Sequence, residues 1–326
     1  MSEGSATTDT TAPSSASPVA PSTEVMISIV IPTKGRPKDL AETVRSIAAQ
    51  EQLPHELLII DQSAQSAELQ IRQVIGTEGG IAVKYIWAPE IPGLVQARID
   101  GVRKASGNVI FFIDDDVTLD PHCIRRLAAR YAERPEAAGI CAVDVGGAEV
   151  PWWLVLARRA YMLGTFRDER SVMNKRYRSL SMPQSVRLFS GGWMSYRRWV
   201  FDEFQFEGNL WGHRWNSSID FSYRVSGKYP LIIDPMVRIW HRRPYGTHTP
   251  QEFVRIRVSG TFFFFSRNVR KDLAGWLSFA WVLVAIFIRS IWRGLQTKAL
   301  RATLVTFFEE IRKGREFLKQ PFTASY

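Results

Sequence analysis

Four strand-like apolar segments alternate with helical segments in the first third of the chain. The strand-like runs are residues 27–33, 56–63, 83–89 and 108–116, and each is rich in β-branched or aromatic residues. The segments between them are 34–50, 67–75 and 94–105, and the first carries Leu40, Val44 and Ile47 at helical spacing. Strands that alternate with helices predict right-handed β-α-β crossovers and an α/β fold with a mostly parallel sheet flanked by helices.

Aspartates stand at the ends of two of these strands. Asp61 ends the second, and Asp114, Asp115 and Asp116 end the fourth. In open α/β sheets, ligands bind beyond the carboxyl ends of the strands. Adjacent carboxylates repel one another, but they supply the oxygen ligands that a divalent cation prefers. The triplet therefore predicts a site for a metal and a diphosphate. Asp120, which precedes Pro121, is predicted to cap the next helix instead.

The charge of the chain indicates what kind of partner it binds, and its cysteine content indicates whether it has a disulfide framework. The chain has a net charge of +10, and Lys and Arg concentrate after about residue 155 beside aromatic or aliphatic runs. This pattern favours a membrane surface over a nucleic-acid partner. Cys123 and Cys141 are too few for a disulfide framework and are predicted to be small buried residues. Residues 1–24, rich in Ser, Thr, Ala and Pro, are predicted to form a disordered tail.

Several blocks of the chain, taken in order, resemble the family 2 glycosyltransferases. The blocks are IPTKGR, the strand that ends on Asp61, ARIDGVRKASGNVIFFIDDD and GGWMSYRR, and the resemblance covers roughly residues 26–241. It implies a GT-A fold and an inverting enzyme that uses a nucleotide-sugar donor. The chemistry agrees, because a metal neutralises a leaving diphosphate and a base must take the proton of the acceptor hydroxyl.

The resemblance also implies roles for particular residues. Six would bind the donor: Thr33, Arg36, Asp61, Arg98, Asp114 and Asp115. Asp116 would bind Mg²⁺ or Mn²⁺, and His241 in the strand-like run VRIWHRRP would complete the metal site. Gly191, Gly192 and Trp193 would form the floor of the acceptor site, where small residues let the backbone approach the sugar.

Residues 210–235 depart from the family pattern. The family usually carries Glu-Asp-x-Asp here, whereas this chain has Ser217, Ser218 and then Asp220. The usual base maps to Ser218, and a serine is no general base near neutral pH without help. Either Asp220 or His213 takes the role, or the alignment is off by two, or Asp220 caps a helix and catalysis is impaired. Asp220 qualifies only if this segment is a loop, because helical residues two apart point about 200° away from each other.

The C-terminal region is apolar and aromatic. A spanning helix needs about 20 apolar residues, and residues 273–292 reach that length only by including one arginine. Tryptophans near both ends fit a membrane–water interface. We predict membrane contact, by a single span or by an interfacial helix; the alternative is a buried helical subdomain. The aromatic and basic residues 151–169 are predicted to form an acceptor loop or to rest on lipid.

These observations predict three regions: the tail at 1–24, a GT-A catalytic domain at 25–250, and a helical membrane-associating region at 251–326. The expected activity is metal-dependent sugar transfer from a nucleotide sugar to a glycan or lipid-linked acceptor. The resemblance extends to membrane-associated bacterial members of the family that build surface polysaccharides. It therefore implies cell-surface polysaccharide synthesis at the cytoplasmic face of the cell membrane. No nucleic-acid partner is expected. The alternatives are a catalytically impaired membrane-bound scaffold and a nucleotidyltransferase, although IPTKGRPKD is only faintly like the Gly-rich basic loop of the latter.

Overall fold

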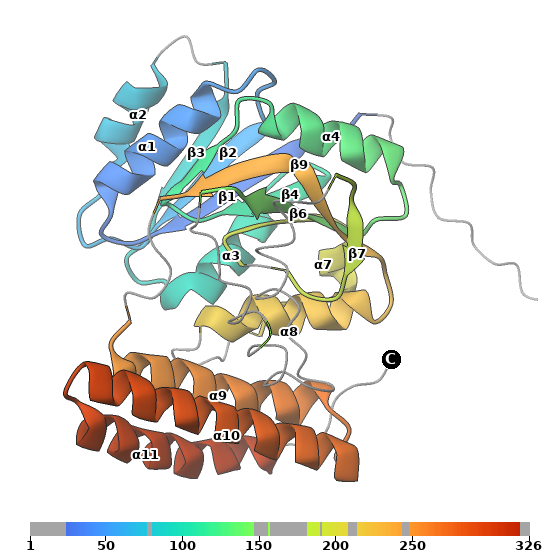
Figure 1. Cartoon of the computed structure of the whole chain (residues 1–326). Coiled ribbons are helices and arrows are strands. Elements are labelled where there is room, and N and C mark those ends of the chain that lie inside the picture. Colours follow the sequence, from blue (N-terminus) through green and yellow to red (C-terminus); the bar gives the residue numbers. More distant parts are fainter. Residues whose placement is uncertain are drawn as a thin grey trace, which may run out of the picture.

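The computed structural model describes residues 24–76, 80–146, 156, 181–189, 191–207, 214–242 and 248–319. The first β-α repeats are β1 Ile27–Thr33, α1 Pro37–Ala48, β2 Glu56–Asp61, α2 Glu68–Ile75, β3 Ala82–Trp87, α3 Gly93–Lys104 and β4 Val109–Ile113 (Figure 1). The middle of the chain forms β5 Val117–Leu119, α4 Cys123–Glu133, β6 Gly139–Asp144, β7 Gln184–Val186, β8 Trp193–Arg197, α7 Val200–Glu203, α8 Arg214–Ser226 and β9 Leu231–His241. The last helices are α9 Pro250–Asn268, α10 Leu273–Gln296 and α11 Leu300–Leu318.

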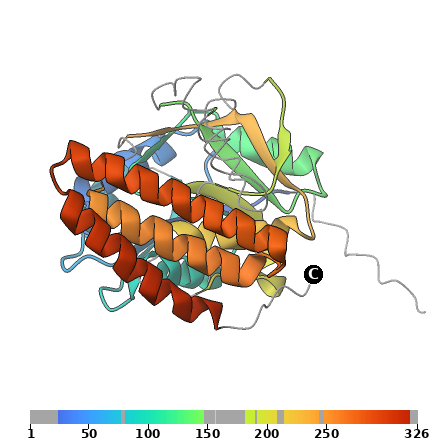
Figure 2. The ribbon, with the colours of Figure 1, turned by 60° about the horizontal axis from the view of Figure 1, so that its bottom comes forward.

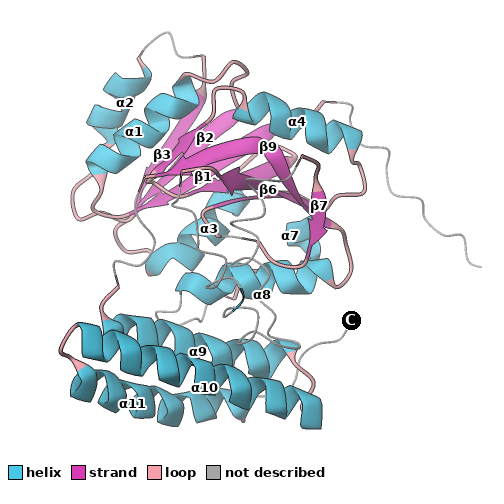
Figure 3. Cartoon of the chain, in the orientation of Figure 1, coloured by secondary structure: helices cyan, strands magenta, loops and turns pink. Residues whose placement is uncertain are grey.

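Nine strands within the described residues form a single mixed sheet. Its order is β3-β2-β1-β4-β8-β6-β9-β5, with β7 paired to β9. The strands are magenta in Figure 3. From β3 to β4 all neighbours are parallel, because a helix returns the chain between each strand and the next. β8 then runs antiparallel between β4 and β6. The predicted α/β fold is confirmed, and its parallel half contains all four strands read from the sequence.

Helices cover both faces of the sheet. Helices α1, α2 and α4 lie on one face and α3, α7 and α8 on the other (Figure 1). The core between them includes Phe111 and Phe112 of β4, both fully buried. A Cβ at Gly101 of α3 would lie 2.3 Å from a methyl carbon of Val30. Only glycine therefore lets α3 approach β1 this closely. Cys123 and Cys141 are also buried, as predicted.

The predicted helix cap at Asp120 is wrong. Helix α4 begins at Cys123, and its N-cap residue His122 makes no capping bond through its side chain. The Asp120 carboxylate instead accepts the backbone N–H of His122 at 3.0 Å and a guanidinium N–H of Arg126 at 3.1 Å. The carboxylate thus closes a local turn before the helix, and α4 begins only after this turn, at Cys123.

The last three helices pack together beside the α/β part and form a second hydrophobic cluster. They run side by side in both views (Figure 2). Helix α9 joins the two parts: Phe264 packs edge-on against Tyr223 of α8, with ring centroids 5.0 Å apart. Thr249 begins α9 with a capping box that includes Glu252. Helix α10 is long and apolar enough to cross a membrane by length and composition, although 28% of its most apolar stretch is buried within the protein.

Candidate active site

The carboxyl ends of β1, β2 and β4 bring the predicted donor residues to one edge of the sheet. Thr33 and Asp61 are register partners at the ends of β1 and β2. The Thr33 hydroxyl donates to the Asp115 carboxylate at 2.7 Å. The side chain of Thr33 thereby links the end of β1 to the aspartates that follow β4, as the parallel order requires.

Asp61 is held by the protein's own donors. Its carboxylate accepts the backbone N–H of Ser63 at 2.9 Å and the hydroxyl of Tyr85 at 2.5 Å. Burial, and then this bond to Asp61, raise the pKa of Tyr85 well above its usual value. Trp87 at the end of β3 donates its indole N–H to the Ser63 carbonyl at 2.9 Å and stays half exposed. The edge therefore carries a fixed carboxylate beside an accessible aromatic ring.

Asp115 is buried and faces Arg36. A guanidinium nitrogen of Arg36 lies 3.1 Å from Asp115 and 3.4 Å from Asp116. Burial raises the pKa of Asp115 to about 6, against the hydrogen bond from Thr33 and the charge of Arg36. The backbone carbonyl of Asp115 accepts from the Thr43 hydroxyl at 2.7 Å and from Arg242 at 3.1 Å. These bonds fix the turn that aims the carboxylates.

Asp116 and His241 form the pair that fits a metal ion. The Nε2 atom of His241 lies 3.2 Å from Oδ1 of Asp116. Burial alone would lower the pKa of His241, but the bond to Asp116 and the charges of Asp114 and Asp144 outweigh it and raise that pKa. The Trp193 ring packs beside the imidazole at a centroid distance of 5.6 Å. A carboxylate oxygen and an imidazole nitrogen are ligand types for Mn²⁺ or Mg²⁺ sites that take further ligands from water and phosphates.

The described residues contain no group of three or more His, Cys, Asp and Glu side chains placed to hold a metal ion. One or two protein ligands are usual where the rest come from a substrate diphosphate. The Asp116–His241 pair therefore fits such an ion.

Arg98 is a buried cation at the centre of the site, 2% exposed. It donates to the Ser218 hydroxyl at 2.9 Å and to the Gly191 carbonyl at 2.5 Å, and lies 3.4 Å from Asp114. Burial lowers the pKa of Arg98 and raises the pKa of Asp114, while each group's charge opposes the effect of burial on the other. The positive charge of Arg98 is thus surrounded by hydrogen-bond acceptors at the end of β4.

The two glycines of the predicted acceptor floor lie close against side chains of the site. A Cβ at Gly191 would lie 2.4 Å from the Ser218 hydroxyl, and one at Gly192 would lie 2.5 Å from an Asp114 oxygen. The Gly192 carbonyl also accepts the backbone N–H of Asp114 at 2.9 Å. Trp193 is 4% exposed and lies in β8, so most of its indole is core rather than an open stacking surface.

The structure does not meet the condition under which Asp220 was predicted to serve as the base. Helix α8 begins at Arg214, so Ser218 and Asp220 are both helical and project in different directions. Ser218 contacts Arg98, whereas the fully buried Asp220 contacts Arg224 at 2.9 Å and Asn268 of α9 at 2.9 Å. Asp220 is also no helix cap, since it lies in the middle of α8. His213 and the aromatic segment 151–169, apart from residue 156, lie outside the described residues.

Four contributors to the site were missed by the sequence analysis: Tyr85, Trp87, Thr43 and Arg242. Tyr85 and Trp87 stand at the end of the third predicted strand, where the rule that pointed to Asp61 also applies. Thr43 and Arg242 hold the Asp115 carbonyl from elements far apart in the chain, and no local pattern signals such a contact.

The fold is a mixed α/β sheet whose parallel strands end at an acidic edge beside a buried arginine. Residues 28–204 match the sequence profile described as Glycosyl transferase family 2. This match covers more than half of the chain, and the protein belongs to that family.

Curated relatives match shorter stretches. The glucosyl-dolichyl phosphate glucuronosyltransferase of Haloferax volcanii is 30% identical over 130 residues, 39% of this chain and 39% of that protein. The uncharacterized glycosyltransferase YwdF of Bacillus subtilis is 33% identical over 112 residues, 31% of this chain and 37% of its own. The chain thus spans under two fifths of the length of each of these relatives.

Solved structures share the fold at low identity. S. aureus TarS 1-349 in complex with UDP-GlcNAc has a TM-score of 0.56 at 15% identity, over 90% of this chain and 81% of its own. The mannosyltransferase PcManGT of Pyrobaculum calidifontis, in complex with GDP-Man and Mn²⁺, has a TM-score of 0.56 at 15% identity, over 91% and 90%. Both likenesses support the GT-A fold.

Proposed function

We propose that the protein transfers a sugar from a nucleotide-sugar donor to an acceptor hydroxyl, with inversion and with a bound Mg²⁺ or Mn²⁺. The observation that carries the proposal is the Asp116–His241 pair, 3.2 Å apart, beside the buried Arg98. The family membership and the two ligand-bound neighbours support the same reaction class.

Each residue of the edge has a part in the proposed reaction. Thr33, Asp61 and the half-exposed Trp87 would receive the nucleoside, and Arg36 and Arg98 would stabilise the phosphates by charge-assisted bonds. Asp114 and Asp115 would position the sugar and ribose. Asp116 and His241 would hold the metal, which when bound offsets the charge of the leaving diphosphate. Gly191 and Gly192 leave room for the acceptor.

The chemical step needs a base for the acceptor hydroxyl. The acceptor oxygen attacks the anomeric carbon as the bond from that carbon to the diphosphate oxygen breaks, and the acceptor proton passes to the base. Ser218 has no carboxylate to act as this base, and Asp220 is directed toward α9. Of the two residues that the sequence analysis named as possible bases, His213 therefore stays the candidate.

A catalytically impaired scaffold is the second candidate, because Ser218 replaces the family's carboxylate. It would bind a nucleotide sugar without turnover in any acceptor mixture. A turnover assay across acceptors separates the two proposals.

For the setting, we propose a lipid-linked or glycan acceptor in cell-surface polysaccharide synthesis at the cytoplasmic face of a membrane. Support comes from the apolar α10 and from the Haloferax relative, whose name refers to a glucosyl-dolichyl phosphate.

Asp116→Asn tests the donor and metal site. Thermal shifts with UDP- and GDP-sugars, measured with Mn²⁺ and with a chelator, report binding because ligands stabilise the native state. The variant should lose most of the stabilisation seen with Mn²⁺ and little of that seen with chelator. Asp202→Asn, an exposed aspartate of α7, is the matched control and should behave as wild type. Equal losses in both conditions would make Asp116 a structural residue.

A further inference from the structure

The outer side of the last helices is a long apolar face. Its members are large hydrophobic side chains that are at least 41% exposed: Leu273, Trp276, Leu277, Trp281, Val284, Ile288, Trp292 and Leu295 of α10, with Val305 and Phe308 of α11. We call these residues the α10 face. Phe287 joins its two helices, with ring centroids 6.2 Å from Phe308. A contiguous exposed apolar surface of this kind marks a site of protein or membrane contact.

The opposite side of α10 is buried along the whole helix. Gly275, Phe279, Val282, Ile286 and Gly294 are among its buried residues and recur at helical spacing from one end to the other. A Cβ at Gly294 would lie 2.9 Å from the Leu300 Cα, so the start of α11 is pressed against the end of α10. Protein therefore covers one side of α10 at every level, and the exposed side faces away from it.

The neighbouring helices carry charge where a membrane-spanning α10 would need hydrocarbon. Glu310 of α11 is 5% exposed, accepts from Ser259 of α9 at 2.6 Å and pairs with Lys313 at 2.9 Å. Ser259 and Glu310 lie midway along their helices, which run beside α10 (Figure 2). Charged groups at the centre of a bilayer are costly. Helix α9 is also packed on α8, so a spanning α10 would draw the α/β part toward the bilayer.

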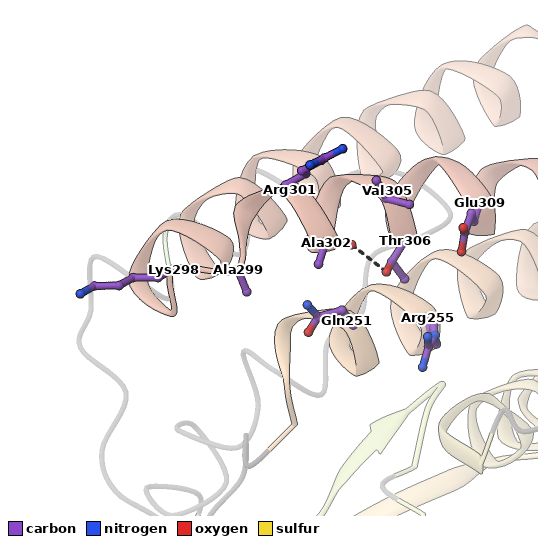
Figure 4. A pocket seen from close by; sticks show the side chains of 9 residues that line it. All are labelled: Gln251, Arg255, Lys298, Ala299, Arg301, Ala302, Val305, Thr306 and Glu309. Carbon is purple, nitrogen blue, oxygen red and sulfur yellow. Dashed lines mark hydrogen bonds between the residues drawn. The ribbon is translucent and has the colours of Figure 1, made fainter.

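The part of the chain that carries the α10 face is basic. Between Arg270 and Lys319 the chain has ten Lys and Arg against four Asp and Glu. A groove of about 640 Å³ opens between the starts of α9 and α11 (Figure 4). Among the described residues, its charged lining residues are the cations Arg255, Lys298 and Arg301 and the single carboxylate Glu309. Val305 lines this groove and also belongs to the α10 face. Cations beside an apolar, tryptophan-bearing face match the headgroups of anionic lipids.

We propose that the α10 face binds the surface of an anionic bilayer with α10 lying in the plane of the membrane rather than crossing it. The groove at Lys298 and Arg301 then receives lipid phosphates. This inference rests on the membrane setting of the proposed function but not on sugar transfer.

Vesicle flotation of the full chain tests the surface. Wild type should bind phosphatidylglycerol-containing vesicles at least tenfold more tightly than phosphatidylcholine vesicles, and high salt should remove the difference. Leu277→Glu places a charge on the α10 face and should weaken binding at least tenfold. Leu69→Glu is the matched control, since Leu69 is 80% exposed on α2, and it should bind as wild type.

Unfolding temperatures of both variants verify that they fold. Equal vesicle binding by Leu277→Glu and wild type would overturn the proposal. It would also be overturned if wild type were a dimer that binds no vesicles and Leu277→Glu made it a monomer. In that case a second copy of the chain would cover the α10 face.

Labelling of the two ends of α10 tests its orientation. Lys271→Cys, just before α10, and Gln296→Cys, at its end, both lie outside the α10 face and are exposed. They are examined separately in sealed inside-out membrane vesicles from cells that express the full chain, with a membrane-impermeant maleimide. Both sites should react alike, while the native cysteines are buried. Reaction at one end only, until detergent opens the vesicles, would show a span and overturn the proposal. Donor binding, followed by thermal shift, is scored independently, so failure here leaves the glycosyltransferase proposal intact.

Discussion

Glu56 is a buried carboxylate at the start of β2, at the opposite edge of the sheet from the aspartates. It accepts from the Ser28 hydroxyl at 2.6 Å and from the backbone N–H and hydroxyl of Ser106, and pairs with Lys84 at 2.7 Å. Burial alone would raise its pKa, but these donors outweigh burial and hold the pKa at about 2. One residue thus joins β1, β2, β3 and the loop before β4.

Glu56→Gln should lower the free energy of unfolding near pH 7 by about 1–3 kcal/mol. The depressed pKa stabilises the fold above the unfolded-state pKa of 4.5, and wild type loses this contribution as the pH falls from 4.5 toward 2. Chemical denaturation across pH 2–7 should therefore show the two proteins converging at low pH. Glu68→Gln, which removes an exposed pair with Arg72, should cost less than about 1 kcal/mol at every pH. If the difference in unfolding free energy between wild type and Glu56→Gln stayed constant from pH 7 to pH 2, packing rather than charge would explain the effect.

At the scale of elements, α8 connects the active-site edge to the last helices. Its Ser218 accepts from Arg98, and its Asp220 accepts from Asn268 of α9 and pairs with Arg224. Arg267 of α9 pairs with Glu207 at 2.7 Å in the same cluster. Because one helix carries both contacts, the positions of Arg98 and of the Gly191 carbonyl that it contacts depend on the docking of α9.

Asp220→Asn should lower the free energy of unfolding by about 3 kcal/mol, because it leaves a partly buried arginine without its charge partner. Turnover, measured below the unfolding transition, should fall less than about tenfold, whereas loss of a general base costs about 10² to 10⁴. As a comparison, Asp234→Asn breaks the pair between Asp234 of β9 and Arg130 of α4, away from the candidate site. It should lower the free energy of unfolding by a similar amount. A hundredfold loss of turnover with unchanged stability would restore Asp220 as the base.

At the scale of the molecule, the α/β part and the three helices share an interface through α9. Phe262 and Phe265 of α9 contact Phe279 of α10, with ring centroids 4.9 and 4.3 Å apart. Removal of α10 and α11 would leave these rings in water.

Truncation after Arg270 should therefore give a product of low solubility or lowered unfolding temperature. Phe265→Ala in the full chain should lower the free energy of unfolding by about 3–5 kcal/mol through the same contacts. Soluble yield and calorimetry measure both. A soluble truncated chain with the wild-type unfolding temperature would show that α9 does not depend on packing against α10 and α11.

The sequence alone determined the β-α repeats, the aspartate edge, the buried cysteines and the helical character of the C-terminal region, because each rests on a local apolar pattern or a short motif. The division of that region into α9, α10 and α11 came from the structure. Only the tertiary structure decided which side chains meet. The start of α8 at Arg214 turns Asp220 away from Ser218, and the turn at Asp120 delays α4. The contacts of Arg98 with Ser218, and of Asp116 with His241, join residues more than a hundred positions apart. Such contacts depend on sheet order and helix packing, which no local spacing encodes.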